Sequence, residues 1–172
     1  MDLPMVVLRF FHIVSGALWF GSAFVFVGFV APTVAEMGPS SGSFMSLLVK
    51  KHRLGSVFNV LIATTGIAGW LMWFVLVSRY TPAQWFGHPY GLVLTTGAVL
   101  GTIAGVLGIA VVGRNVSRII ELGDQIRAAG TAPSPEQGAQ LARLGAAVAT
   151  YSRIVLGLLF VAVGAMAVAE YW

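Results

Sequence analysis

The sequence predicts an all-α integral membrane protein, a bundle of four transmembrane helices with both termini on the outer side. Of its 172 residues, 58% are hydrophobic and only 9% are charged, which is too little charge for the surface of a soluble domain. Four apolar stretches fill most of the chain, and a spanning helix needs roughly 20 mostly apolar residues. No room is left for a separate soluble module, so we expect one domain, residues 1–172.

The four spans are expected at residues 6–31, 54–78, 91–113 and 151–170. The first should end at Pro32, because proline removes a helical hydrogen bond and clashes with the preceding turn. The third should continue beyond the membrane as a cytoplasmic extension, since apolar residues recur at helical spacing as far as Ala129. The segment Gly130–Pro135 should break that helix, and a new one should start at Pro135 and lead into the fourth span.

Basic residues predict the orientation of the bundle. Most of them follow the first span or the third: Lys50, Lys51, Arg53, Arg114, Arg118, Arg127, Arg143 and Arg153. The positive-inside rule places these segments in the cytoplasm and both termini outside. The net charge of +4 is therefore a topology signal and not a nucleic-acid-binding patch. We expect a multi-pass protein of the plasma membrane, in contact with the lipid bilayer.

Aromatic residues gather toward the outer side. They are Trp70, Trp73, Tyr80, Trp85, Tyr90, Tyr171 and Trp172. This one-sided distribution is typical of an interfacial belt. A belt combined with an aromatic-walled outer pocket is the alternative.

His12 lies inside the first span, about two turns from its outer boundary. An ionisable residue at membrane depth is costly and marks a partner, a cavity or a cofactor. Imidazole is the usual axial ligand of haem b and a common ligand of copper or zinc. A histidine hydrogen-bonded to a neighbouring helix is the alternative. The chain has no cysteine, which excludes thiolate metal sites and covalently attached haem.

The residues around His12 read Arg9-Phe10-Phe11-His12-Ile13-Val14-Ser15-Gly16-Ala17-Leu18-Trp19-Phe20-Gly21. This spacing of His, small residues and Trp resembles the first helix of a group of small bacterial membrane proteins. The group includes the copper-resistance D-type proteins and the HemJ-like protoporphyrinogen oxidases. The resemblance implies a bacterial inner membrane protein in which His12 contacts haem or a metal. The third span has no lysine or histidine, which departs from the HemJ-like pattern and argues against protoporphyrinogen oxidation.

A second axial ligand must come from the depth of His12. His88 ranks first, because it lies in the outer segment before the third span; a solvated loop histidine is its alternative. Met72 ranks second, about two turns from the outer end of the second span, with simple packing as its alternative. An open or water-bound position ranks third. His52 lies at the inner end of the second span, more than ~20 Å from the level of His12.

Two arginines and a tryptophan complete the candidate site. Arg9 precedes His12 by three residues on the same helix face. It can meet a haem propionate through charge-assisted hydrogen bonds, or pair with Glu170 at the outer end of the fourth span. Arg79 can reach a propionate from the second span, and Trp19 is expected in the apolar wall of the site.

Small and uncharged polar residues predict how the helices meet. Gly97, Gly101 and Gly105 form a ridge at four-residue spacing that lets another helix approach closely. The partner helix is in the same bundle or in a second protomer, and we expect a homo-oligomer through this ridge. Asn59 and Thr65 in the second span either line a polar seam or bond between helices.

These observations favour a membrane-embedded haem b protein, a small b-type cytochrome with His12 and His88 as metal ligands. It would transfer electrons near the outer face, with a quinone or a periplasmic redox partner. Whether it also acts as a haem-dependent oxidoreductase stays open at this point. One alternative is a copper-binding or copper-transport membrane protein that uses His12, His88 and Met72. The other is a non-catalytic structural or assembly protein.

Overall fold

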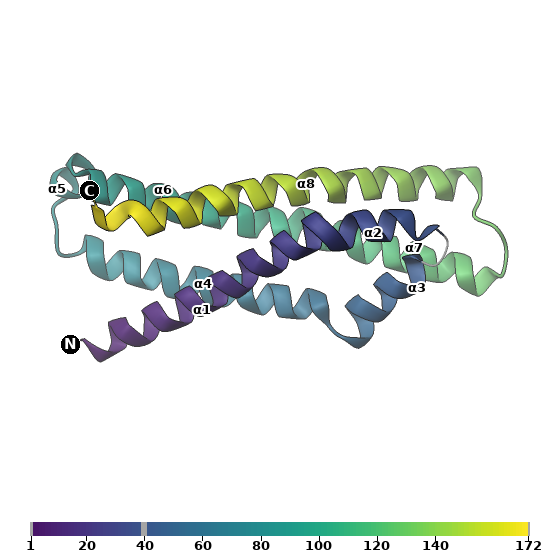
Figure 1. Ribbon diagram of the computed structural model, residues 1–172, viewed down its shortest axis with the longest axis horizontal. Coiled ribbons are helices and arrows are strands. Elements are labelled where there is room, and N and C mark those ends of the chain that lie inside the picture. Colours follow the sequence, from purple (N-terminus) through teal and green to yellow (C-terminus); the bar gives the residue numbers. More distant parts are fainter. Residues whose placement is uncertain (1, 39–40, 172) are drawn as a thin grey trace.

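The computed structural model describes residues 2–38 and 41–171, and in these residues the regular secondary structure is helical throughout. Four helical segments are long and apolar enough to cross a membrane: Leu3–Glu36, Leu54–Val77, Pro89–Ala129 and Pro135–Tyr171. Both termini lie at one end of the bundle, the same end as the short helix α5 (Pro82–Gly87), which is next to the C-terminus in Figure 1. We call this the terminal end, and the opposite end, which carries most of the basic residues, the basic end.

The first segment runs through three helical elements without a break. They are α1 (Leu3–Val25), the π-helical η1 (Phe26–Val30) and α2 (Ala31–Glu36). The prediction that the helix ends at Pro32 is wrong. Just before the proline, the N–H of Ala31 bonds to the carbonyl of Phe26, five residues back. This shift in the hydrogen-bond pattern lets the helix continue past a residue that has no N–H to donate.

A short helical lead-in precedes the second span. It consists of α3 (Ser41–Ser46) and the π-helical η3 (Leu47–Lys51), and Arg53 in a left-handed conformation separates it from α4 (Leu54–Val77). After α4, a capping box between Thr81 and Gln84 starts α5, and the ring of His88 caps the next helix.

The third segment is one long helix made of α6 (Pro89–Leu107), the π-helical η4 (Gly108–Gly113) and α7 (Arg114–Ala129). Gly130, with φ of 64°, ends it. A capping box between Ser134 and Gln137 then starts α8 (Pro135–Val168), which a single 3₁₀ turn, η5 (Ala169–Tyr171), completes. The predicted extension, break and restart are therefore confirmed. At the basic end, α7 and the start of α8 project past α2 and α3 (Figure 1).

The four long helices form two close pairs. α1 packs mainly against α4, and α6 mainly against α8, whereas fewer contacts join one pair to the other. A small apolar core links the pairs; it consists of Trp19, Ala23, Ala104, Val155 and Leu159. Many large apolar side chains are exposed on the outside of the bundle, and Phe160 on α8 is 70% exposed. An outward apolar surface of this kind suits a chain surrounded by lipid.

Two glycines of the predicted ridge are already in close contact within the chain. A Cβ at Gly97 would lie 3.2 Å from the carbonyl oxygen of Ala162 on α8, and a Cβ at Gly105 would lie 3.0 Å from Ile62 on α4. Gly101 has open space around it. At two of its three positions the ridge therefore packs α6 against helices of the same chain, α8 and α4. A homo-oligomer formed through the ridge stays a prediction.

Candidate functional site

His12 projects from α1 onto α4, where its Nδ1 lies 2.8 Å from the backbone carbonyl oxygen of Thr65. A carbonyl oxygen only accepts hydrogen bonds, so in the neutral ring Nδ1 carries the proton and Nε2 keeps a free lone pair. The ring is half-buried. Its orientation is therefore set by a backbone group, and its second nitrogen is left able to accept a proton or a metal ion.

Gly69 provides the space for this ring. A Cβ at that position would lie 2.7 Å from Cε1 and 2.8 Å from Nδ1 of His12. Real side chains do not approach so closely, so any other residue at position 69 would displace the imidazole. The absence of a side chain on α4 is thus part of how His12 is held.

Hydroxyl groups extend the contact between α1 and α4 next to His12. Ser15 is buried and donates to the carbonyl of Phe11 one turn earlier. Thr65 lies with its Oγ1 2.8 Å from the Ser15 hydroxyl and 2.7 Å from the carbonyl of Leu61. Of the two expectations for Thr65, the structure bears out the second: it forms a hydrogen bond between helices, to Ser15 of α1. Together with the His12 bond, this bond fixes the register of α1 on α4.

The structure separates the two arginines of the predicted site. Arg79 lies 3.8 Å from the carboxylate of Asp2, which joins the start of α1 to the chain just after α4. Arg9 is exposed and makes no ion pair with the described residues. The predicted pairing of Arg9 with Glu170 is therefore not formed, and Arg9 retains a free guanidinium one turn from His12.

The two candidate second ligands lie in different surroundings. Met72 is half-buried on α4, three residues after Gly69 and seven after Thr65, which puts it on the helix face that meets His12. His88 is exposed at the N-terminus of α6, and its Nδ1 accepts from the backbone N–H of Tyr90 at 3.4 Å. A neutral His88 that accepts at Nδ1 carries its proton on Nε2, the opposite arrangement to His12.

The tryptophans of the terminal end form a packed cluster with satisfied indole groups. Trp73 and Trp85 both donate to the hydroxyl of Thr95, each at 3.0 Å, and Trp70 donates to Thr102 at 2.9 Å. Trp85 is only 2% exposed. Its buried side chain differs from the interfacial position expected of a belt residue. Tyr171 is exposed, and Trp172 lies outside the described residues.

Gly91 lets α5 fold back closely onto α6 beside this cluster. A Cβ at Gly91 would lie 2.0 Å from the carbonyl oxygen of Trp85. The rings of Tyr80, Trp73 and Tyr90 pack around the Trp85 indole with centroid distances of 5.6 to 6.2 Å. The aromatic residues thus fill the space between α4 and α6, which belong to different helix pairs, at the terminal end of the bundle.

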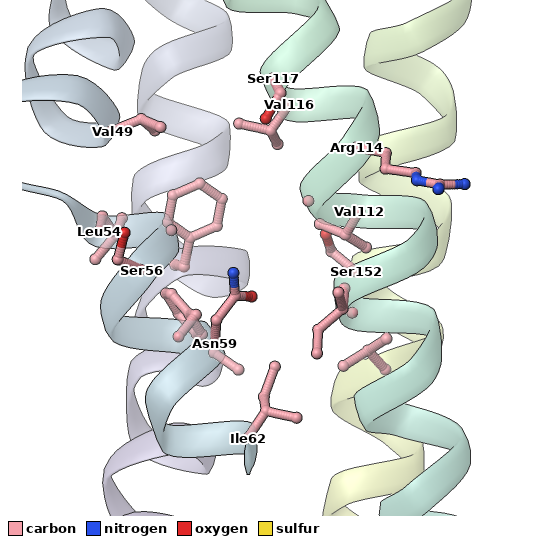
Figure 2. Close-up of a pocket in the computed structure, with 18 of the residues that line it drawn as sticks. Val49, Leu54, Ser56, Asn59, Ile62, Val112, Arg114, Val116, Ser117 and Ser152 are labelled. Carbon is pink, nitrogen blue, oxygen red and sulfur yellow. The ribbon is translucent and has the colours of Figure 1, made fainter.

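Trp19 occupies a different position from the one expected. It lies in the core that joins the helix pairs, 5% exposed, two turns further along α1 than His12. It also forms part of the wall of a cavity of about 800 Å³ between the pairs, on the side of the basic end (Figure 2). Sequence reasoning did not predict this cavity, because its walls come from helices that are far apart in the chain.

Among residues 2–38 and 41–171, no group of three or more His, Asp or Glu side chains is arranged to hold a metal ion. Any metal centre at His12 therefore needs a prosthetic group or a ligand of another kind. No family model, no curated protein and no solved structure matches this chain. The functional argument thus depends on the geometry of the site itself.

Proposed function

We propose that the protein is a membrane-embedded haem b protein whose iron is bound by Nε2 of His12, and that it transfers electrons near the outer membrane face. The observation that carries the proposal is the hydrogen bond from His12 Nδ1 to the Thr65 carbonyl. Metal-binding histidines almost always donate their second ring N–H to a carbonyl or carboxylate, which fixes the tautomer and raises the basicity of the ligating nitrogen.

The residues around His12 fit such a group. Gly69 makes room for the ring against α4, Met72 lies one turn further along the same face of α4, and Arg9 has no ion-pair partner among the described residues. We infer that Arg9 binds a propionate and that Met72 precedes His88 as candidate second ligand. His88 keeps the role only if it releases Tyr90, because its Nδ1 already accepts from that backbone N–H.

In this proposal the haem carries the electron, and the protein holds and shields it. Bound haem supplies an iron that alternates between the ferric and ferrous states, so substrate chemistry is not required. His12 holds the ring orientation through Thr65, and the apolar surroundings limit access of water. The positive-inside rule puts the terminal end, and so His12, toward the outside of a bacterial inner membrane. A quinone or a periplasmic protein is the redox partner that this position favours.

Absorption spectra of the purified full-length chain, oxidised and then reduced with dithionite, test the proposal. A Soret band that shifts on reduction is expected, and it should be lost in His12→Gly. Added imidazole should restore the band in this variant, because the free ligand can occupy the space of the missing side chain. His52→Ala is the matched control: it removes an exposed histidine at the basic end and should leave the spectrum unchanged.

The same preparation distinguishes the alternatives. A colourless protein that stays colourless after incubation with haem contradicts the proposal. If that protein carries copper by elemental analysis, the copper-binding or transport alternative is favoured. If it is free of metal, the hydrogen bond of His12 serves to hold α1 on α4, and a structural or assembly role is favoured.

A further inference from the structure

The cavity between the helix pairs is layered from apolar to charged along the membrane normal. Toward the middle of the bundle its lining includes Trp19, Ile62 and Val155, and nearer the basic end it includes Asn59 and Ser152. Arg118 and Glu121 lie at the mouth. Its volume of about 800 Å³ lies within the roughly 300–1,000 Å³ typical of ligand sites.

All three π-helical segments in the described part of the chain contribute to this one cavity. Phe26 and Val27 come from η1, Val49 from η3, and the stretch from Gly108 to Gly113 is η4. π-helical turns are rare and occur frequently at functional sites. Their coincidence around one space favours a binding site over a packing defect.

Asn59 carries the argument for a polar occupant. It lies five residues inside α4, and Figure 2 shows its amide extending into the space between α4 and η4. Asn59 is exposed and Ser152 is half-buried, and neither makes a hydrogen bond to the described residues. Polar side chains at membrane depth are costly unless something accepts their hydrogen bonds. An occupant with oxygen acceptors at this level removes that cost.

Arg118 and Glu121 balance each other in the lining at this end of the cavity, and the excess positive charge comes from basic residues next to the lining. Arg118 lines the mouth, and Lys51 and Arg53 lie within two residues of other lining positions; none of the three has an ion-pair partner in the described chain. Glu121 is the acidic residue that lines the cavity, and Arg114 directs its guanidinium away from it (Figure 2). Clusters of this kind at the cytoplasmic side of a membrane protein attract anionic head groups.

We propose that this cavity binds one anionic phospholipid of the inner leaflet. Its phosphate lies at Arg118, its ester carbonyls accept from Asn59 and Ser152, and an acyl chain extends toward Trp19. The length of the cavity fits the upper part of a phospholipid, from its phosphate to part of an acyl chain. The wall from Trp19 to Val27 covers eight residue steps, or about 12 Å, and the wall from Gly108 to Glu121 covers thirteen, or about 20 Å. A lipid in its ordinary bilayer orientation presents acyl chain, esters and phosphate in this same order.

Native mass spectrometry of the delipidated full-length chain in detergent tests the proposal. The protein is titrated with phosphatidylglycerol and, separately, with phosphatidylcholine of the same acyl chains. One phosphatidylglycerol should bind per chain, in preference to phosphatidylcholine. Gly55→Leu should weaken this binding about tenfold, because Gly55 lines the cavity with open space at its Cβ position. Gly66→Leu is the matched control on α4, also with open space but away from the cavity.

A charge variant tests the head group independently. Arg118→Gln should reduce the ratio of the affinity for phosphatidylglycerol to that for phosphatidylcholine about tenfold, because one charge-assisted contact to the phosphate is lost. Arg143→Gln removes an exposed arginine of α8 that does not line the cavity, and it should leave the preference unchanged.

Three results would overturn the assignment: equal binding of the two lipids, binding to Gly55→Leu as tight as to the unaltered chain, or displacement of the bound lipid by a ubiquinone analogue at equal concentration. If Gly55→Leu fails to fold, as judged by circular dichroism, the Arg118→Gln comparison decides. These outcomes do not depend on haem, so they are separate from the test of His12.

Discussion

The two halves of the bundle treat their polar side chains in opposite ways. Toward the terminal end, the imidazole of His12 bonds to Thr65, and the indoles of Trp73 and Trp85 bond to Thr95. Toward the basic end, Asn59 and Ser152 face a cavity and have no hydrogen-bond partner in the described chain. The polar groups near His12 and in the tryptophan cluster hold helices together, whereas Asn59 and Ser152 at the cavity stay available. Outside the cavity the basic end has its own link, an ion pair between Lys50 of η3 and Asp124 of α7.

This difference indicates that the polar side chains near the terminal end stabilise the fold, whereas those at the cavity are available to a ligand. Within a bilayer no water is present to satisfy a polar group, so a bond made across two helices fixes their positions. Open donors around a cavity instead favour an occupant. We therefore expect side-chain changes near the terminal end to cost stability, and comparable changes near the basic end to cost little in the absence of lipid.

Gly91→Ala should give the largest effect. The new Cβ would collide with the Trp85 carbonyl, and because that oxygen is backbone, α5 must move away from α6. We expect a loss of about 3 kcal/mol in unfolding free energy, at the upper end for overpacking. Thermal unfolding followed by circular dichroism in detergent measures it. Gly87→Ala, with open space at its Cβ, should change stability by less than about 0.5 kcal/mol; similar losses in both variants would refute the argument.

Gly69→Ala should give the second-largest loss of stability, because its Cβ would push the His12 ring away from α4. We expect a loss of about 2 kcal/mol from overpacking and the broken bond to Thr65. The haem band, if present, should weaken in parallel. Gly66→Ala, on the same helix without near neighbours, should keep both the stability and the spectrum. A normal spectrum in Gly69→Ala would argue that the ring orientation is unimportant for ligation.

Thr95→Val should have an intermediate effect. It removes the oxygen that accepts from both Trp73 and Trp85, while the volume hardly changes. Two indole N–H groups would lose their acceptor, for an expected cost of about 1–2 kcal/mol. Thr96→Val changes the neighbouring exposed threonine, which makes no such bond, and should be neutral. Tryptophan fluorescence measures the unfolding transition of both variants. Equal transitions for Thr95→Val and Thr96→Val would mean that the stability of the cluster depends on ring packing alone.

Asn59→Leu should give the smallest effect. Because the amide has no hydrogen-bond partner among residues 2–38 and 41–171, its replacement in lipid-free detergent should change the unfolding free energy by less than about 0.5 kcal/mol. The comparison between the halves fails if this variant loses as much stability as Thr95→Val. Added phosphatidylglycerol should raise the unfolding midpoint of the unaltered chain more than that of Asn59→Leu, because a bound lipid stabilises the folded state in proportion to its affinity.

Hydropathy and turn chemistry were sufficient to predict the spans, the long third helix and its break at Gly130. They failed at Pro32, because the π-helical shift that accommodates the proline depends on hydrogen bonds among residues that carry no distinctive sequence signal. The hydrogen-bond acceptor of His12 could not be predicted from the sequence either, since it is a backbone carbonyl and every residue has one. The cavity was missed for a third reason: Asn59 and Ser152 are distant in sequence, and only the packing of α4, η4 and α8 brings them to one space.

The hairpin of α7 and α8 has a practical consequence. The helix Pro89–Ala129 has 41 residues and is about 60 Å long, twice the roughly 30 Å thickness of the hydrocarbon layer. In a chain that spans a bilayer of this thickness, its turn, residues 130–134, would extend well beyond the lipid surface into the aqueous phase. Since the chain contains no cysteine, a single thiol introduced there would be unique, and its reaction with a membrane-impermeant reagent would reveal which compartment the turn occupies.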